Sequence, residues 1–284
     1  MKIGIVGQGY VGLPLAIQFA KSGLDVLGLD IDSKKVDAIN AGQTYIKHIT
    51  SEMIADQVKA GLFSASTDFA RVRELDAVII CVPTPLNKNR EPDISYITDT
   101  GRAIAPHLKK GCVVILESTT YPGTTDEDLR KVLEEGSGQK AGTDFHLAFS
   151  PEREDPGNPD SKVASIPKVI GGFTPACLEK AMAVYSKAIK TLVPVSSCRA
   201  AEATKLVENK IGSNITDTQA AVGQLLAGNY SRVKAYTVHN HLIRAFEGRA
   251  EHEKANDDEG DTKDRTGHEA SHPRGRSIGP DILF

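Results

Sequence analysis

The sequence predicts an α/β fold, a doubly wound and mostly parallel Rossmann-type sheet followed by a C-terminal helix and a disordered tail. Three observations lead to this prediction. Short β-rich runs alternate with longer helical patterns, which is the βαβ rhythm of a parallel sheet with helices on both faces. A glycine-rich turn joins the first run to the first helical pattern, and apolar residues become scarce towards the C-terminus.

The alternation extends through residues 1–195, which we expect to form one domain. Strands are expected at Lys2–Val6, Asp25–Asp30, Asp76–Val82, Cys112–Glu117, Phe145–Phe149, Lys168–Gly171 and Thr191–Val195. Helices are expected at Leu13–Ser22, from Ser33 onward, at Pro175–Ile189 and from Cys198 through Asn209. Residues 196–227 are expected to hold part of a connecting helix, with Gly212 as its weak point.

Residues 228–284 are predicted to be a disordered tail. Between Glu247 and Ser277 the chain has no Val, Ile, Leu, Met, Cys, Phe, Tyr or Trp. Such a segment cannot bury enough apolar area to offset the entropy lost on ordering. We therefore expect no metal site there, although the tail holds five histidines, namely His239, His241, His252, His268 and His272.

The overall composition excludes several classes of protein. The formal net charge of -3 lacks the basic excess that binding to nucleic acid or to an anionic membrane requires. No run reaches the roughly eighteen apolar residues of a membrane span. The four cysteines are far apart and form no C-x-x-C pair, so we expect neither a zinc cluster nor disulfides. This use of cysteine predicts a cytoplasmic protein.

The segment GQGYVG follows the first expected strand directly and opens the first expected helix. This is the context that a dinucleotide-binding G-x-G-x-x-G motif requires. Gly7 permits the tight turn, Gly9 lets a pyrophosphate approach the backbone, and Gly12 allows close packing of helix and strand. With Tyr10 and Val11 they form a candidate cofactor site, where the helix N-terminus offers N–H groups to phosphates.

Asp30 ends the second expected strand, about 20 residues after the first glycine of this motif. An acidic side chain at this point accepts hydrogen bonds from the adenosine ribose and repels the 2′-phosphate of NADP, which favours NAD. Lys34 and Lys35 are nearby cations that could tolerate such a phosphate. The alternative interpretation is a glycine-rich turn beside a surface aspartate.

Polar residues follow three further expected strands, at the edge where an open parallel sheet binds its ligand. Thr84 lies in VPTP, Thr119 in ESTTYPGT and Glu152 in FSPER. Threonine hydroxyls here could bind the nicotinamide side of the cofactor, although the same residues are typical of turns. Glu152 could instead pair with Arg153 or another surface cation.

Lys205 and Asn209 are four residues apart in AEATKLVENK. On a helix both side chains project from one face. By spacing alone they could also be two solvated side chains on an exposed helix face. Beyond them Lys210, Gly212 and Ser213 interrupt the helical pattern.

Six motifs in order give the sequence a family resemblance: GQGYVGLPLA, GLDID, CVPTPL, ESTTYPGTT, FSPEREDPGN and AAEATKLVEN. They resemble the UDP-sugar 6-dehydrogenases, which oxidise a sugar C6 alcohol to a carboxylate. The resemblance covers residues 1 to about 210. ESTTYPGTT and SPEREDPGN look most like the branch that acts on UDP-N-acetylglucosamine or its epimers, in polysaccharide biosynthesis.

The resemblance implies NAD as the cofactor and a UDP-sugar as the substrate. It implies that Asp30 and Lys35 hold the adenosine end of NAD, and that Thr84 and Thr119 line the nicotinamide side. Members of the family dimerise through the connecting helix, which is broken here, so the oligomeric state stays open, with a homo-oligomer as one alternative.

The resemblance also implies a catalytic group. In the family two hydrides go to two NAD molecules, while a cysteine thiol holds the aldehyde as a thiohemiacetal and then as a thioester. Covalent capture splits one difficult oxidation into easier steps. Thr119 and Glu152 are then catalytic, with Glu152 assisting water in thioester hydrolysis. Lys205 and Asn209 stabilise the oxyanion that develops.

The sequence departs from the family after residue 210. The family carries its thiol further along, in a glycine-rich loop of G-G-H-C type, and no such loop follows here. None of the four cysteines matches that position: Cys81, Cys112, Cys177 and Cys198. We therefore expect an incomplete chain, as truncation or a shifted reading frame would produce, with little or no turnover.

Three functions stay open at this point. The first is a catalytic NAD-dependent UDP-sugar 6-dehydrogenase, which the motifs favour. The second is a non-catalytic NAD-binding Rossmann module, which the missing thiol favours. The third is a smaller β-hydroxyacid dehydrogenase, but residues 210–284 are too short and too polar for the all-α domain that it needs.

Overall fold

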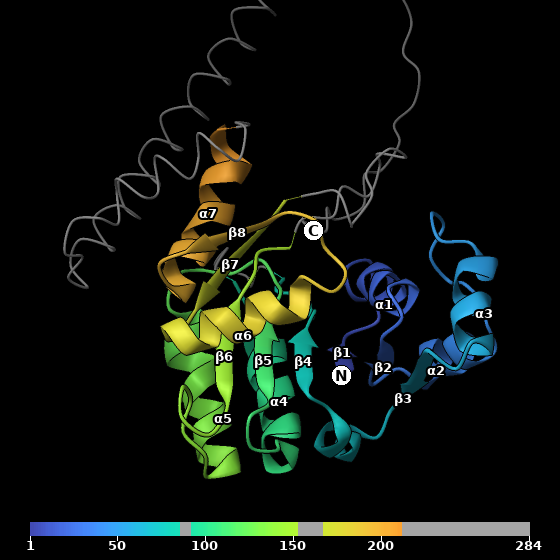
Figure 1. The fold of residues 1–284 in the computed structure, drawn as a ribbon, viewed down its shortest axis with the longest axis horizontal. Helices are drawn as coiled ribbons and strands as arrows, with labels where there is room; N and C mark the ends of the chain where they lie inside the picture. Colours follow the sequence, from blue (N-terminus) through green and yellow to red (C-terminus); the bar gives the residue numbers. More distant parts are fainter. Residues whose placement is uncertain (86–91, 153–166, 212–284) are drawn as a thin grey trace, which may run out of the picture. The chain divides into compact units, whose positions relative to one another are not determined.

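The computed structural model describes residues 1–85, 92–152 and 167–211, the last six of these by their backbone alone. Its strands are β1 (Lys2–Val6), β2 (Asp25–Leu29), β3 (Phe63–Ser66), β4 (Ala77–Ile80), β5 (Val113–Leu116), β6 (His146–Phe149), β7 (Lys168–Gly172) and β8 (Leu192–Val195). They form one sheet in the order β3-β2-β1-β4-β5-β6-β7-β8 (Figure 1). All neighbours are parallel except β6 and β7, so the predicted mostly parallel sheet is confirmed.

Helices connect the strands. The α-helices are α1 (Gly12–Lys21), α2 (Ser33–Asn40), α3 (Ser51–Lys59), α4 (Ser95–Ile104), α5 (Arg130–Ser137), α6 (Pro175–Tyr185) and α7 (Cys198–Ile211). Two 3₁₀ turns, η1 (Phe69–Glu74) and η2 (Ala105–His107), and a π-helix, η3 (Thr124–Leu129), complete the described elements. None of the described helices combines the length and the apolar character needed to cross a membrane.

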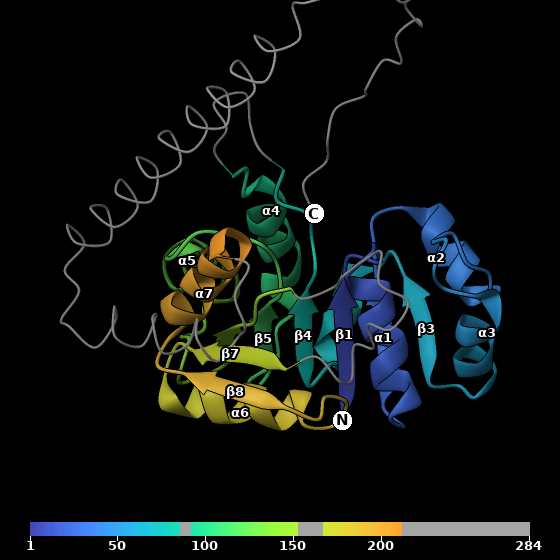
Figure 2. The same cartoon turned by 90° about the horizontal axis from the view of Figure 1, so that it is seen from above.

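Side chains that alternate along each strand divide the core into two layers. On β1, Ile3 and Ile5 belong to the layer under α1, α2, α3 and α6, whereas Val6 belongs to the layer under α4, α5 and α7. Figure 2 shows α6 and α7 on opposite sides of β7 and β8. Because helices cover both faces, the central strands are apolar along their whole length.

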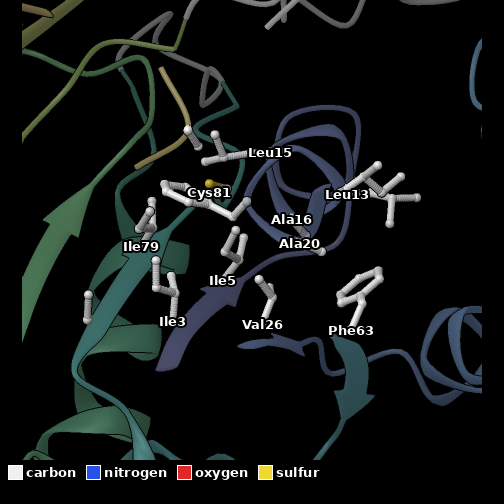
Figure 3. Packing of buried hydrophobic residues seen from close by; sticks show 14 of the residues in the cluster. Ile3, Ile5, Leu13, Leu15, Ala16, Ala20, Val26, Phe63, Ile79 and Cys81 are labelled. Atoms are coloured by element: carbon white, nitrogen blue, oxygen red, sulfur yellow. The ribbon is translucent and has the colours of Figure 1, made fainter. Parts of the chain in front are cut away.

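Helix α1 lies close to the strands that lead into the carboxyl edge of the sheet. Ala16 and Ala20 face the sheet near Ile5 and Val26, as Figure 3 shows, and all four are buried in one cluster. Small side chains on this helix face allow the helix backbone to approach the strands. This approach places the N-terminus of α1 directly above the end of β1.

Some boundaries differ from the predicted ones. Helix α6 ends at Tyr185 and not at Ile189, because the backbone tightens there into i→i−3 turns, with the amide of Ala188 bonded to the carbonyl oxygen of Tyr185 at 3.0 Å. Ile189 stays in the core, which explains why the apolar pattern continued. Asp30 and Glu117 lie just beyond β2 and β5 instead of inside them.

Four of the described strands and α-helices were absent from the prediction: β3, α3, α4 and α5. β3 is a short edge strand in which only alternate residues are buried, and α5 buries only Leu133. Such elements carry too few apolar residues to show a clear period. The expected tail, residues 228–284, lies outside the described residues.

A buried polar cluster joins β5, β7 and α6. The Nζ of Lys168 and the hydroxyl of Tyr185 each donate to a carboxylate oxygen of Glu117, both at 2.5 Å. Burial, together with the charge of Glu117, raises the pKa of Tyr185, so its phenol remains a donor. Lys168 reaches this place because β7 runs antiparallel to β6, which puts the first residue of β7 at the edge where β5 ends.

Lys168→Met should lower the free energy of unfolding by about 3–5 kcal/mol, because it leaves Glu117 as a buried charge without its cation. Lys110→Met is the matched control: the Lys110 side chain is 80% exposed and lies 3.3 Å from Asp144. Loss of that surface pair should cost about 0–1 kcal/mol. Urea denaturation of both variants measures the difference, and equal losses would contradict the role given to the buried pair.

Candidate functional site

The candidate site lies at the carboxyl edge of the parallel strands. Gly7 follows β1, Asp30 follows β2, Thr84 lies shortly after β4, Thr119 after β5 and Glu152 after β6. Parallel pairing of these strands brings their ends to the same edge. Open α/β sheets bind their ligands in the crevice at this edge.

The three glycines of GQGYVG have different local surroundings. Gly7 has a φ of 89°, and a Cβ on it would lie 2.5 Å from the carbonyl oxygen of Cys81. A Cβ on Gly12 would lie 1.8 Å from the carbonyl oxygen of Gly7. A Cβ on Gly9 would meet no atom within 4 Å. The loop is therefore tightly packed at both ends and open in the middle, where a phosphate could approach the backbone.

The start of α1 suits an anion. Val11 occupies the N-cap and has no side-chain acceptor, so it offers nothing to the N–H groups of the first turn. Tyr10 is exposed beside the loop, and its ring centroid lies 5.8 Å from that of His48. The first turn thus presents its positive dipole end to the open part of the glycine loop.

Asp30 is nearly buried, at 6% exposure, and the surrounding chain fixes its carboxylate. Its Oδ2 accepts hydrogen bonds from the amide of Gln8 at 2.7 Å and from Nζ of Lys35 at 3.3 Å. Its Oδ1 accepts one from the amide of Asp32 at 2.9 Å. The structure thus brings Asp30 and Lys35 together beside the glycine loop, and the alternative of a surface aspartate does not hold.

Tyr45 also contacts this loop, and the sequence analysis missed it. Its hydroxyl donates to the carbonyl oxygen of Gln8 at 2.6 Å. Burial, together with the charges of Asp30 and Asp32, raises the pKa of Tyr45, so the hydroxyl remains a donor. Tyr45 lies between α2 and α3, outside every motif, so no spacing rule pointed to it.

Thr84 and Thr119 lie together where β4 and β5 end. The hydroxyl of Thr84 donates to the carbonyl oxygen of Thr119, and the hydroxyl of Ser118 donates to the carbonyl oxygen of Val82. Both threonines are partly buried. These two hydrogen bonds hold the loops after β4 and β5 against each other.

Lys205 and Glu152 form a pair between α7 and the segment that follows β6. The Nζ of Lys205 donates to the carbonyl oxygen of Glu152 at 2.7 Å and lies 3.4 Å from its Oε2. The two side chains are 13% and 9% exposed. Lys205 is therefore not a solvated residue on an exposed helix face.

Glu202 is a second acidic side chain on α7, and its side chain is fully buried. Its Oε2 accepts a hydrogen bond from the amide of Gly123 at 2.7 Å. Its Oε1 accepts two from Thr125, one from the amide at 2.9 Å and one from the hydroxyl at 2.7 Å. Burial raises the pKa of Glu202 to about 8, although the hydrogen bonds from Thr125 and Gly123 act in the opposite direction.

All four cysteines of the chain are buried, and none forms a disulfide. Cys81 lies among the apolar side chains between α1 and the sheet, near Leu15 and Ile79 in Figure 3. Burial raises the pKa of Cys112 to about 12, and it also raises the pKa of Cys198. A nucleophilic cysteine must be accessible and readily ionised, so these thiols are poor nucleophiles.

Several predicted residues fall outside what the structure describes. Asn209 lies on α7 one turn after Lys205, but only its backbone is described, so its pairing with Lys205 stays a prediction. Arg153 and the five histidines of the tail are also outside the described residues. Within the described part of the chain, no group of three or more His, Cys, Asp or Glu residues could hold a metal ion.

The chain is similar to known nucleotide-sugar dehydrogenases. Residues 1–189 match the model of the UDP-glucose/GDP-mannose dehydrogenase family, NAD binding domain. A UDP-N-acetyl-D-glucosamine 6-dehydrogenase of Pseudomonas aeruginosa is 37% identical over 211 residues, covering 74% of this chain and 49% of the relative. For a UDP-N-acetyl-D-mannosamine dehydrogenase of Escherichia coli K12 the identity is 37% over 216 residues, covering 73% and 50%.

A solved structure agrees with these relatives. The NDP-N-acetyl-D-galactosaminuronic acid dehydrogenase of Methanosarcina mazei Go1 matches with a TM-score of 0.69 and 35% identity, covering 78% of this chain and 53% of that one. The chain spans about half the length of the curated relatives it matches. The match therefore includes the sheet and its carboxyl edge but leaves much of each relative without a counterpart.

The pKa of Glu202 leads to a pH-dependent stability. Because this pKa is higher in the folded chain than its ordinary value of 4.5, the folded state binds the proton more tightly, and stability is lost as pH rises from about 4.5 to about 8. One unit of pKa corresponds to about 1.4 kcal/mol, so the loss is on the order of a few kcal/mol.

Glu202→Gln should remove this pH dependence, since an amide does not ionise. Urea denaturation of both proteins between about pH 5 and about pH 9 tests it, because other groups contribute equally to the two curves. The free energy of unfolding of the wild type should fall relative to that of the variant as pH rises. Parallel curves would show that Glu202 does not titrate in this range.

The burial of the cysteines leads to a second expectation. In the native protein no thiol should react appreciably with Ellman's reagent, whereas all four should react in denaturant. The absorbance of the released thiolate counts the reacting groups. A thiol that reacts rapidly under native conditions would overturn the assignment of all four as structural residues.

Proposed function

Since the chain belongs to the UDP-glucose/GDP-mannose dehydrogenase family, we propose that it forms the NAD-binding part of an NAD-dependent UDP-sugar 6-dehydrogenase. One observation carries the proposal. The open backbone at Gly9, the fixed carboxylate of Asp30 and the Lys205–Glu152 pair all lie at one edge of the sheet. NAD supplies the acceptor for the hydride that leaves the sugar C6 carbon.

The cofactor half of the site divides into two parts. The glycine loop and the first turn of α1 receive the pyrophosphate, because Gly9 leaves its backbone accessible. Asp30 and Lys35 hold the adenosine ribose, since the Nζ of Lys35 on α2 already lies 3.3 Å from the Asp30 carboxylate that follows β2. Thr84 and Thr119 line the nicotinamide side, where their loops are bonded to each other.

The reacting half of the site is built from the Lys205–Glu152 pair. A lysine ammonium that is 13% exposed is a strong electrostatic partner for the oxyanion that develops at C6, and Asn209 adds an amide donor from the next turn. Glu152 assists the water that hydrolyses the acyl intermediate. The hydrogen bond from Lys205 to the backbone of Glu152 keeps both groups at the same place.

A second candidate function is an NAD-binding module without turnover. The burial of all four thiols favours it, because residues 1–284 then offer no accessible cysteine to capture the aldehyde. Turnover would need a thiol from another polypeptide or another segment. The four cysteines form no disulfides, which is typical of a reducing compartment and favours a cytoplasmic location. A homo-oligomer is part of the same proposal.

The proposed substrate is a UDP-N-acetylhexosamine. Two relatives with 37% identity are named for UDP-N-acetyl-D-glucosamine and UDP-N-acetyl-D-mannosamine. The motifs ESTTYPGTT and SPEREDPGN point to the same branch. The oxidised product would serve polysaccharide biosynthesis.

Calorimetry with NAD and NADP tests the cofactor site. The wild type should bind NAD at least about tenfold more tightly than NADP, because Asp30 repels the 2′-phosphate. Gly9→Ala should weaken NAD binding by about tenfold or more without lowering the melting temperature, since its methyl group meets only the space left for the pyrophosphate. Unchanged binding by Gly9→Ala would refute the role of the loop, and no binding by the wild type would refute the proposed function.

Gly111→Ala is a control with the opposite behaviour. Gly111 has a φ of 79° and open space around it, at the amino end of β5 and away from the site. Its substitution should cost roughly 1–2 kcal/mol of stability through backbone strain but leave NAD affinity unchanged. With UDP-N-acetylglucosamine or UDP-glucose and NAD present, the wild type should not sustain NADH formation, because the second oxidation requires a thiol that captures the aldehyde.

A further inference from the structure

The loop between β5 and η3 carries Thr119 and is fixed at both of its ends. At its start, the hydroxyl of Ser118 and the hydrogen bond between Thr84 and Thr119 join it to the loop after β4. At its end, Gly123 adopts a φ of 111°, in the region that favours glycine, and leads into the π-helix η3. The position of Thr119 therefore depends on what holds Gly123.

Glu202 holds the end of this loop from another element. One carboxylate of α7 satisfies the amides of Gly123 and Thr125 and the hydroxyl of Thr125. The first amides of a helix have no partner within the helix, so buried amides here need an acceptor from elsewhere. Glu202 supplies that acceptor, and no side chain of the loop itself is bonded to these amides among the described residues.

The same face of α7 carries Lys205, three residues after Glu202. Lys205 contacts the carbonyl oxygen and the carboxylate of Glu152 after β6. Through Glu202 and Lys205, α7 thus contacts the segments that follow β5 and β6, which are neighbouring strands. A shift of α7 along its axis would displace both contacts together.

A surface contact between the same elements contributes less. Arg199 of α7 lies 2.8 Å from Asp126 and 2.5 Å from Glu127 of η3, and its side chain is 40% exposed. Exposed ion pairs contribute about 0–1 kcal/mol because water screens them. Donors that are buried and lose their acceptor cost about 1–3 kcal/mol each, so Glu202 outweighs Arg199.

We propose that Glu202 is a positioning residue: it holds the Thr119 loop in the conformation that receives the nicotinamide half of NAD, against the helix that carries Lys205. This inference rests on the proposed function. Glu202 itself touches neither cofactor nor substrate. Its effect passes through Gly123 and Thr125 to the loop, and hydride transfer is sensitive to such placement because the reacting atoms must approach within about 3–3.5 Å.

Comparison of NAD with ADP-ribose isolates this role. ADP-ribose has the adenosine and pyrophosphate groups that the glycine loop and Asp30 would bind, but it lacks nicotinamide. Glu202→Met removes every acceptor at nearly constant length, and it should weaken NAD binding by about tenfold while leaving ADP-ribose binding unchanged. Calorimetry on the full chain gives both affinities.

Three more variants sharpen the test. Glu202→Gln keeps one acceptor oxygen and should restore part of the NAD affinity. Thr125→Val removes the hydroxyl that donates to Glu202. It should also lower NAD affinity, but by a smaller factor than Glu202→Met. Glu135→Met is the matched control, because Glu135 is 67% exposed on α5, and it should change neither affinity.

The outcomes distinguish a failure of the positioning role from a failure of the cofactor site. If the wild type binds both ligands and Glu202→Met weakens both equally, or neither, the positioning role is refuted while the cofactor site stands. If the wild type binds neither ligand, the proposed function fails first and the inference fails with it. A loss confined to NAD, with partial recovery in Glu202→Gln, supports the inference.

Discussion

Parallel pairing of neighbouring strands is the constraint on which the site depends. Since β1, β2, β4, β5 and β6 run in the same direction, the backbone leaves all of them at one edge. Helices bury both faces of the sheet, so this edge is where polar groups can gather without disturbing the core. Residues as far apart in sequence as Gly7 and Glu152 lie at the same edge because of strand direction alone.

Helix α7 reaches the same edge by a different route. It begins beside Gly171 of β7, whose Cβ would lie 2.1 Å from the carbonyl oxygen of Ser197, so the chain passes very close to the sheet there. The helix then reaches η3 through Glu202 and the end of β6 through Lys205. Burial of the Glu202 carboxyl group is costly, and three donors offset only part of that cost, since its pKa is still raised. The contact therefore favours the observed position of α7 over positions that are shifted along the helix axis.

The fold class could be predicted from the sequence, whereas several contacts of the site could not. Strands buried on both faces give continuous apolar runs, and the glycine motif has a fixed spacing, so both are visible without a structure. The bonds of Tyr45 to Gln8 and of Glu202 to Gly123 join residues 37 and 79 positions apart. No local rule connects such residues. The pairing of Lys205 with Glu152 was equally invisible, since the spacing of Lys205 from Asn209 also suits a solvated helix face. Only the family resemblance pointed to the role proposed for it.

The long separation between Glu202 and Gly123 has a consequence for the order in which the chain folds. Gly123 leaves the ribosome 79 residues before Glu202, whose carboxyl group accepts its hydrogen bond. Chains begin to fold from the N-terminus during synthesis, and closing a long loop costs more entropy than closing a short one. A nascent chain that ends before α7 would already hold the glycine loop and Asp30, but the amides of Gly123 and Thr125 would still lack the acceptor that α7 provides. The contacts of α7 with the segments that follow β5 and β6 are thus the last part of this edge to be assembled.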